Sequence, residues 1–225
     1  DLSACGGTHV ARTGGIGVIR VTAWEKFKGG TRVEFRCGGR ALTQLRQWQM
    51  LPGRSALWMA VNLSCNQLTA VDIDSTVAAS LAAAAVDPST VHLEITESVL
   101  MERIDGSLET LGALRRLGVH RSVDDFGTGY SSLSYLKRLP VQTLKIDRSF
   151  TDGLGTDPHD TSIVRAISAL SDELGLELLA EGVETQALLL ALEELGCRLG
   201  QGYWWSRPMP ASAATLWLTT RARCR

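Results

Sequence analysis

The sequence has 225 residues, of which 44% are hydrophobic and 21% charged, with a formal net charge of −1. This composition is ordinary for one large globular domain and offers no polybasic field for duplex nucleic acid. The longest strongly apolar stretch, around residues 77–86, is too short to span a bilayer, and no secretion signal is visible. The five dispersed cysteines, without a CxxC pair, favour reduced thiols and a cytoplasmic location.

From about residue 56 onward, apolar strand-like runs alternate with helical patterns. The predicted strands are 57–63, 91–96, 120–126, 143–147, 176–183 and 198–205. Helices are predicted at 71–86, about 108–117, 161–174 and 185–195, and a glycine closes each of the last two. Repeated strand–helix units predict a parallel sheet in an α/β fold. Trp48 and Trp58 are expected in its core.

Polar residues lie at or near the carboxyl end of every predicted strand. They are Asn62, Glu94, the pair Asp124 and Asp125, Lys145, Glu181 and Gln201. Each has an ordinary explanation by itself: Asn62 as a cap, Asp125 as a turn acid, or Lys145 as the partner of a nearby aspartate. A barrel, however, places the carboxyl ends of all its strands around one mouth. One shared site therefore explains all six strands together.

The chemistry of this set of residues favours divalent metal ions. Carboxylate and amide oxygens suit Mg²⁺ or Mn²⁺, and the adjacent Asp124 and Asp125 are placed to bridge two ions, as in phosphoester hydrolysis. Lys145 would then orient the attacking water or neutralise phosphate charge, and Glu181 would be the general base. The residues leave a second chemistry open, an enolase-like site in which a lysine removes a proton beside a metal-bound carboxylate.

Five segments resemble a known family. They are "VNLSCNQL", "LEITES", "DDFGTGYSSLSYLKRLPVQTLKIDRSF", "AEGVET" and "LGCRLGQGYWWSRPMP". Through them the chain resembles, from about residue 43 to 213, the EAL domain, the bacterial phosphodiesterase family that linearises cyclic di-GMP. The resemblance implies a TIM-like (β/α)₈ barrel that hydrolyses cyclic di-GMP to the linear dinucleotide with Mg²⁺ or Mn²⁺.

The same resemblance implies a role for each polar residue. The residues that correspond to metal ligands are Asn62, Glu94, Asp124 and Asp125. Lys145 corresponds to the lysine near the attacking water, and Glu181 to the base or a further metal-side acid. Gln201 corresponds to a glutamine of the metal and water shell. Glu97 corresponds to the glutamate that braces the loop after "DDFG", which in this family couples metal binding to dimerisation, so a homodimer is implied.

The chain departs from the family's pattern at its beginning. The family is named after a Glu-Ala-Leu triplet whose glutamate binds metal, but "GGRAL" at residues 38–42 has an arginine in that place, and the family's nearby substrate arginine is also missing. The sequence therefore predicts an N-terminally incomplete barrel with weaker metal binding and reduced or absent activity. The alternative is a degenerate EAL module that binds cyclic di-GMP or a protein partner without catalysis.

Residues 1–42 resemble a different family, the alanyl-tRNA synthetase editing domain. Their "CGGTH" supplies Cys5 and His9, a spacing that provides two zinc ligands in that family. Two ligands cannot close a tetrahedral zinc site, so these residues are candidates only for a vestigial one. The predicted organisation is a short β-rich fragment at 1–42, a partial EAL domain at 43–213, and a helix end or tail at 214–225. Editing of mischarged alanyl-tRNA is a third function, which would depend on the first segment.

Overall fold

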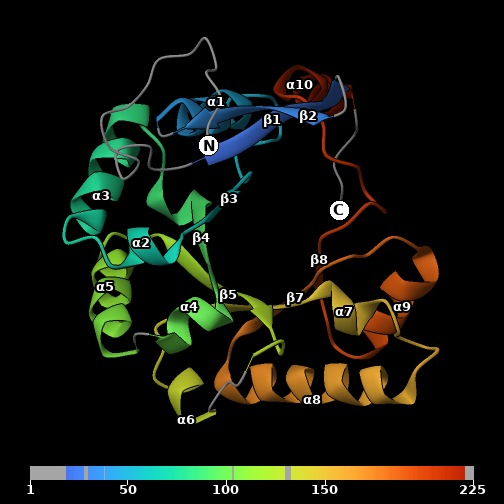
Figure 1. The fold of residues 1–225 in the computed structure, drawn as a ribbon. Coiled ribbons are helices and arrows are strands. Elements are labelled where there is room, and N and C mark those ends of the chain that lie inside the picture. Colours follow the sequence, from blue (N-terminus) through green and yellow to red (C-terminus); the bar gives the residue numbers. More distant parts are fainter. Residues whose placement is uncertain (1–18, 28–29, 38, 103, 130–132, 221–225) are drawn as a thin grey trace.

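The computed structural model describes residues 19–27, 30–37, 39–102, 104–129 and 133–220 (Figure 1). Its centre is a six-stranded sheet in which every neighbouring pair is parallel and the strand order follows the chain. The strands are β3 (Met59–Asn62), β4 (Val91–Thr96), β5 (His120–Phe126), β6 (Thr143–Ile146), β7 (Glu177–Ala180) and β8 (Leu199–Gly200). The prediction of an incomplete TIM-like barrel is confirmed, because sequential parallel strands joined by helices are the arrangement of a (β/α)₈ barrel.

Helices connect the strands and cover the outer face of the sheet (Figure 1). In chain order they are α1 (Gly39–Gln49), α2 (Cys65–Leu68), α3 (Ile73–Ala84), α4 (Glu97–Glu102), α5 (Ile104–Arg116), α6 (Leu133–Leu136), α7 (Arg148–Thr151), α8 (Pro158–Leu174), α9 (Gln186–Glu194) and α10 (Ala211–Thr220). Local sequence defines the ends of α8. The Asp157 side chain caps its first turn by accepting from the His159 amide, and Gly175 closes it with φ +65°.

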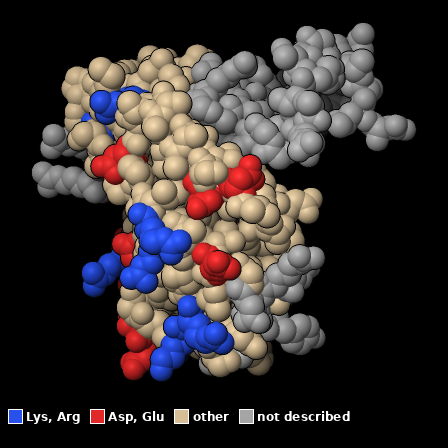
Figure 2. All heavy atoms as spheres, turned by 90° about the vertical axis from the view of Figure 1, so that its left-hand side faces the viewer, with Lys and Arg blue, Asp and Glu red and all other residues tan. Residues whose placement is uncertain are grey.

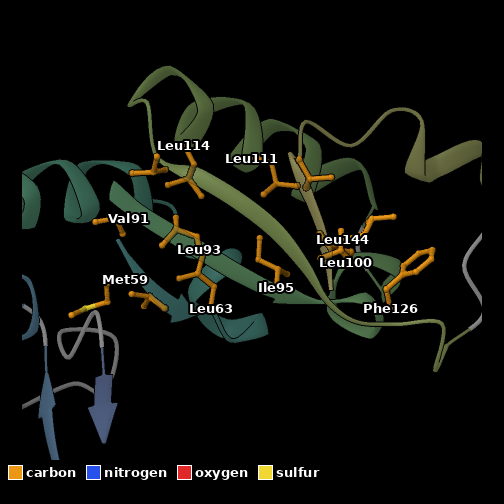
Figure 3. Packing of buried hydrophobic residues seen from close by; sticks show 14 of the residues in the cluster. Met59, Leu63, Val91, Leu93, Ile95, Leu100, Leu111, Leu114, Phe126 and Leu144 are labelled. Atoms are coloured by element: carbon orange, nitrogen blue, oxygen red, sulfur yellow. The ribbon is translucent and has the colours of Figure 1, made fainter. Parts of the chain in front are cut away.

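The core lies between the sheet and these helices. Val91, Leu93 and Ile95 of β4 are buried, and Figure 3 shows them in one apolar layer with Leu111 and Leu114 of α5. Because strand side chains alternate between two faces, the residues between them point to the concave side of the sheet. This alternation places the polar strand residues inside the barrel.

The N-terminal part of the described chain forms a separate hairpin. β1 (Ile19–Phe27) and β2 (Gly30–Cys37) pair antiparallel with each other in their own two-stranded sheet. α1 then packs with α10, where Trp48 Nε1 donates to Thr215 Oγ1 at 2.8 Å, and Trp48 is buried as predicted. The predicted boundaries between the N-terminal fragment, the EAL domain and the tail, after residues 42 and 213, fall within α1 and α10. These boundaries stay predictions.

Two local predictions are wrong. The strand predicted at 198–205 is reduced to Leu199–Gly200, because the chain then turns over Val183, whose amide donates to the Gln201 carbonyl. Trp58 is 45% exposed rather than in the core, because it precedes β3 on the inner side and stacks on His92 with ring centroids 4.0 Å apart. None of the described helices combines the length and apolarity that crossing a membrane requires.

Candidate active site

A buried lysine gathers three carboxylates at the carboxyl ends of the strands. Lys145 Nζ lies 2.8 Å from Glu94 Oε1, 2.6 Å from Asp124 Oδ1 and 2.6 Å from Glu181 Oε1. These side chains come from β4, β5, β6 and the residue after β7, so neighbouring parallel strands bring them together. Lys145 is only 2% exposed, which leaves its ammonium group little contact with solvent.

The charges of this cluster do not balance. Burial alone would lower the pKa of Lys145, but Glu94, Asp124 and Glu181 outweigh it and raise that pKa, so the ammonium group keeps its proton at neutral pH. Burial raises the pKa of Glu94 and of Glu181. Lys145 lowers both pKa values, but the neighbouring acids raise them further, and each pKa stays above its usual value. One ammonium group among several carboxylates leaves a net negative charge that a cation would stabilise.

Asp125 joins the cluster through an unusual backbone conformation. Its φ is +54°, in the left-handed region, and the pairing of β5 with β6 is irregular between Val123 and Phe126. This turn brings one ligand atom each from Asp124, Asp125 and Glu181 within 4.8 Å of one another, close enough to hold a metal ion. Burial raises the pKa of Asp125, and the charge of Asp124 raises it further. A bound cation would oppose both effects, because it stabilises the charged carboxylate.

Asn62 and Gln201 lie at the same end of the barrel but are not joined to the cluster by a hydrogen bond in the described part of the chain. Asn62 ends β3 and is in register with Glu94 on β4. Gln201 follows β8 and is exposed, and its backbone bonds to Ala180 and Val183. It lines a largely apolar cavity of about 710 Å³ that extends between β3 and β8. Cys5 and His9 lie outside the described residues.

Glu97 holds the loop that follows the aspartate pair. It begins α4, is 1% exposed, and its Oε2 accepts a hydrogen bond from the Gly127 amide at 2.8 Å. Its Oε1 is buried without a hydrogen-bond partner among the described residues. A Cβ atom on Gly129 would lie 2.6 Å from this oxygen. The loop therefore lies so close to the Glu97 carboxylate that any side chain at position 129 would collide with it.

The sequence prediction missed one residue that supports Glu181. Thr151 in α7 is fully buried, and its hydroxyl donates to the Glu181 carbonyl at 2.6 Å. Nearby, Arg148 pairs with Glu184 at 2.8 Å and with Asp152 at 3.0 Å, which ties α7 to the loop after β7. No spacing in the sequence marks Thr151, because its contact depends on how α7 folds back over the end of β7.

Comparison with known proteins agrees with this geometry. The family model described as the EAL domain matches residues 23–208. The chain belongs to the EAL-domain family. A second model, the threonyl and alanyl tRNA synthetase second additional domain, matches residues 1–34 and confirms the resemblance predicted for the N-terminal segment.

Relatives of this EAL domain include two proteins of Pseudomonas aeruginosa. The bifunctional diguanylate cyclase/cyclic di-GMP phosphodiesterase MucR is 48% identical over 172 residues, which is 76% of this chain and 25% of MucR. The cyclic di-GMP phosphodiesterase NbdA is 44% identical over 174 residues, 77% of this chain and 22% of NbdA. The chain thus spans about a quarter of the length of these relatives.

Solved structures show the same fold. The structure of the MucR phosphodiesterase in complex with c-di-GMP matches with a TM-score of 0.74 and 45% identity, over 78% of this chain and 71% of that one. Klebsiella pneumoniae BlrP1, solved with manganese and cyclic di-GMP, matches with a TM-score of 0.70 and 31% identity, over 76% of this chain and 43% of that one.

Proposed function

We propose that this EAL domain hydrolyses cyclic di-GMP to the linear dinucleotide with the help of divalent metal ions. The observation that carries the proposal is the buried cluster in which Lys145 contacts Glu94, Asp124 and Glu181, with Asp125 beside it. The similarity to MucR and NbdA, which are named as cyclic di-GMP phosphodiesterases, supports the choice of substrate. In the chain's own residues, the carboxylates around Lys145 raise its pKa, so this ammonium group is poorly suited to remove a proton, which favours phosphodiester chemistry over an enolase-like reaction.

The donors at the mouth fit a hard divalent cation. Asp124, Asp125 and Glu181 would hold it, with Glu94 and Asn62 completing the oxygen ligands from the neighbouring strands. We infer Mg²⁺ or Mn²⁺, because both prefer carboxylate oxygens. When bound, such an ion supplies charge stabilisation to a phosphodiester that is being attacked.

The chain's own groups would divide the remaining work. Glu181, whose pKa burial raises, is placed to accept the proton of the attacking water. Lys145 would hold the carboxylates in place and offset negative charge on the phosphate, and Gln201 would contact the substrate or its water. Glu97, through its bond to Gly127, would keep the loop after the aspartate pair in position and link it to a homodimer interface. A cytoplasmic location fits Cys65 and Cys197, which form no disulfide among the described residues.

A second candidate is a module that binds cyclic di-GMP or a protein partner without turnover. The lack of the Glu-Ala-Leu triplet favours it, because one metal ligand would then be missing from the site. So does the sheet itself, in which no described strand pairs with the outer edge of β3 or of β8. The cavity of about 710 Å³ between these strands would leave the site more open to solvent.

Product chromatography combined with calorimetry separates the two candidates. The purified chain is incubated with cyclic di-GMP and Mn²⁺, and binding of the dinucleotide is titrated in parallel. We expect linear dinucleotide from the unaltered chain, with turnover lost in Asp124→Ala and Glu181→Gln but kept in the control Glu173→Gln, which alters an exposed acid on α8. Tight binding without any product from the folded chain would reject hydrolysis and support the binding module.

A further inference from the structure

A buried arginine that has no acidic partner among the described residues lies at the opposite end of the barrel. Arg121, the second residue of β5, is 1% exposed, and it lies at the amino end of the strand that carries Asp124 near its carboxyl end. Its Nε donates to the Pro140 carbonyl at 2.7 Å, and its Nη1 donates to the Val119 carbonyl. Its Nη2 has no hydrogen bond or ion pair among the described residues. Buried charges of this kind are normally paired with an acid, whereas carbonyl oxygens are the only recorded acceptors of this side chain among the described residues.

The arginine lines a small cavity whose charged groups are all positive. The cavity has a volume of about 210 Å³ and is lined by Arg115, Arg121, Lys137, Gln142 and apolar side chains of the α6–β6 segment and the end of α8. Within the described part of the chain, no aspartate or glutamate lines it and none of its three cations forms a salt bridge. Figure 2 shows that lysine and arginine side chains gather mainly in the lower half of the face that carries α3 and α5.

The electrostatics of the cavity favour an anion. Burial and the neighbouring charge of Arg115 together lower the pKa of Arg121 to about 10, yet the guanidinium group still carries its charge at pH 7. Arg115 lies in the last turn of α5, where it also stabilises the helix dipole. That role explains the position of the exposed Arg115, but it does not explain why Arg121 is buried.

The cavity's shape and donors restrict the kind of anion. Arginine presents a planar fork of donors that matches phosphate oxygens. Gln142 accepts from the Arg121 amide through its Oε1, so its side-chain NH₂ group is a further donor at the same wall. The cavity, of about 210 Å³, is smaller than the usual pocket of a drug-sized ligand, which suits a phosphate group better than a whole cyclic dinucleotide.

We infer that Arg115, Arg121 and Lys137 form a binding site for a phosphate-type oxyanion, either free phosphate or the terminal phosphate of a nucleotide. This site is separate from the carboxylate cluster, because it lies at the amino ends of β5 and β6 whereas the cluster lies at their carboxyl ends. It therefore needs neither the metal ions nor the hydrolytic activity proposed above.

Thermal unfolding with inorganic phosphate tests the site. The melting temperature of the full chain is measured in EDTA at pH 7.5, with phosphate or with chloride at matched ionic strength. We expect phosphate to raise it by about 2–4 °C, as ligand binding to the native state does. The rise should disappear in the double variant Arg115→Gln/Lys137→Gln and remain in Arg165→Gln, which alters an exposed arginine on α8.

The double variant also guards against a general salt effect, because phosphate stabilises many proteins by exclusion from their surface. An equal rise in the unaltered chain and in the double variant would overturn the proposal, as would no rise in either. Arg121→Met gives a second measure of the site, with loss of the phosphate response expected if it folds. Guanosine 5′-monophosphate distinguishes the sources: a matching rise identifies a nucleotide phosphate, and no rise identifies free phosphate, the anion that fits the small cavity.

Discussion

Lys145 is the residue on which the order of the carboxylate cluster depends. Its ammonium group contacts Glu94, Asp124 and Glu181 at 2.6–2.8 Å in an almost fully buried position. Without it, acids from β4, β5 and the end of β7 would face one another with no opposite charge among the described residues. The same negative charge that makes the lysine necessary is what would attract a divalent cation to the mouth of the barrel.

Replacing the lysine should therefore destabilise the metal-free protein. We expect Lys145→Met to lower the free energy of unfolding by about 3–5 kcal/mol, the typical cost of leaving a buried charge uncompensated. Mn²⁺ should restore more stability to this variant than it adds to the unaltered chain. Urea unfolding with and without Mn²⁺ measures both effects, with the exposed Arg198→Met as control. Equal stability of Lys145→Met and the unaltered chain in EDTA would contradict this account.

Thr151 should position Glu181 through its backbone. Thr151→Val removes the hydroxyl that donates to the Glu181 carbonyl at 2.6 Å and leaves this partly buried acceptor without that bond, at a cost of about 1–3 kcal/mol. We expect stability to fall by that amount and turnover to fall roughly tenfold. Thr151→Ser keeps the hydroxyl and should restore turnover. Turnover that is unaffected in the valine variant would show that the bond does not position Glu181.

At the scale of elements, the junctions between strands and helices build the site. Asp147 ends the β6 segment and caps α7 by accepting from the Ser149 amide, and Thr151 of the same short helix reaches Glu181. Glu97 likewise opens α4 and holds the loop after β5 through the Gly127 amide. The strands supply the carboxylates, and the first turns of the helices fix the loops around them.

Two glycine substitutions test the loop after β5. Gly129→Ala would place a Cβ atom 2.6 Å from Glu97 Oε1, so we expect it to displace the loop and lower both turnover and the melting temperature. Gly106→Ala on α5 is the matched control, because no atom lies within 4 Å of its added Cβ. Gly106 lies in the first turn of α5, so this control should leave stability unchanged or raise it by less than about 1 kcal/mol. Full activity of Gly129→Ala would contradict the proposed role of the Glu97 contact.

Periodicity and strand-end chemistry predict the elements and the residues of the cluster, but not their conformations. The run "VHLEIT" predicts the strand β4, and the position of Glu94 near its carboxyl end predicts its place in the shared site. The left-handed backbone of Asp125 and the contact of Thr151 with Glu181 arise from tertiary packing, which no local pattern records. The prediction that Trp58 is buried fails for the same reason. An apolar run does not show that the barrel interior beside β3 is open, and Trp58 lines that cavity.

At the scale of the whole molecule, the barrel has a layer of rings at the end opposite the carboxylates. Trp58 stacks on His92, and His92 stacks on His120 with ring centroids 4.1 Å apart. His120 continues the row through a 2.8 Å contact with Thr143, and Glu177 lies 3.9 Å from its ring. This row crosses the amino ends of the strands and lines a cavity of about 320 Å³.

The histidine stack should make the fold sensitive to acid. Burial and the neighbouring His120 lower the pKa of His92 to about 4, below the ordinary value of about 6.5 in an unfolded chain. The neutral ring thus stabilises the fold above about pH 6.5, and this contribution is lost as the pH falls toward 4. Between pH 7 and 5, the melting temperature of the unaltered chain should fall by about 2–4 °C more than that of His92→Phe. Parallel pH curves for the two would contradict this, and the exposed His159→Gln should behave like the unaltered chain.

The claim that this EAL domain cleaves a cyclic dinucleotide at the Lys145 cluster is tested most directly by one rate. The formation of linear dinucleotide from cyclic di-GMP is followed by chromatography as Mn²⁺ is added to the purified, folded chain. We predict product that appears only with Mn²⁺, at a rate that saturates with the metal and is abolished by Asp124→Ala. No product at any Mn²⁺ concentration from the folded chain, or equal product from Asp124→Ala, would contradict the account.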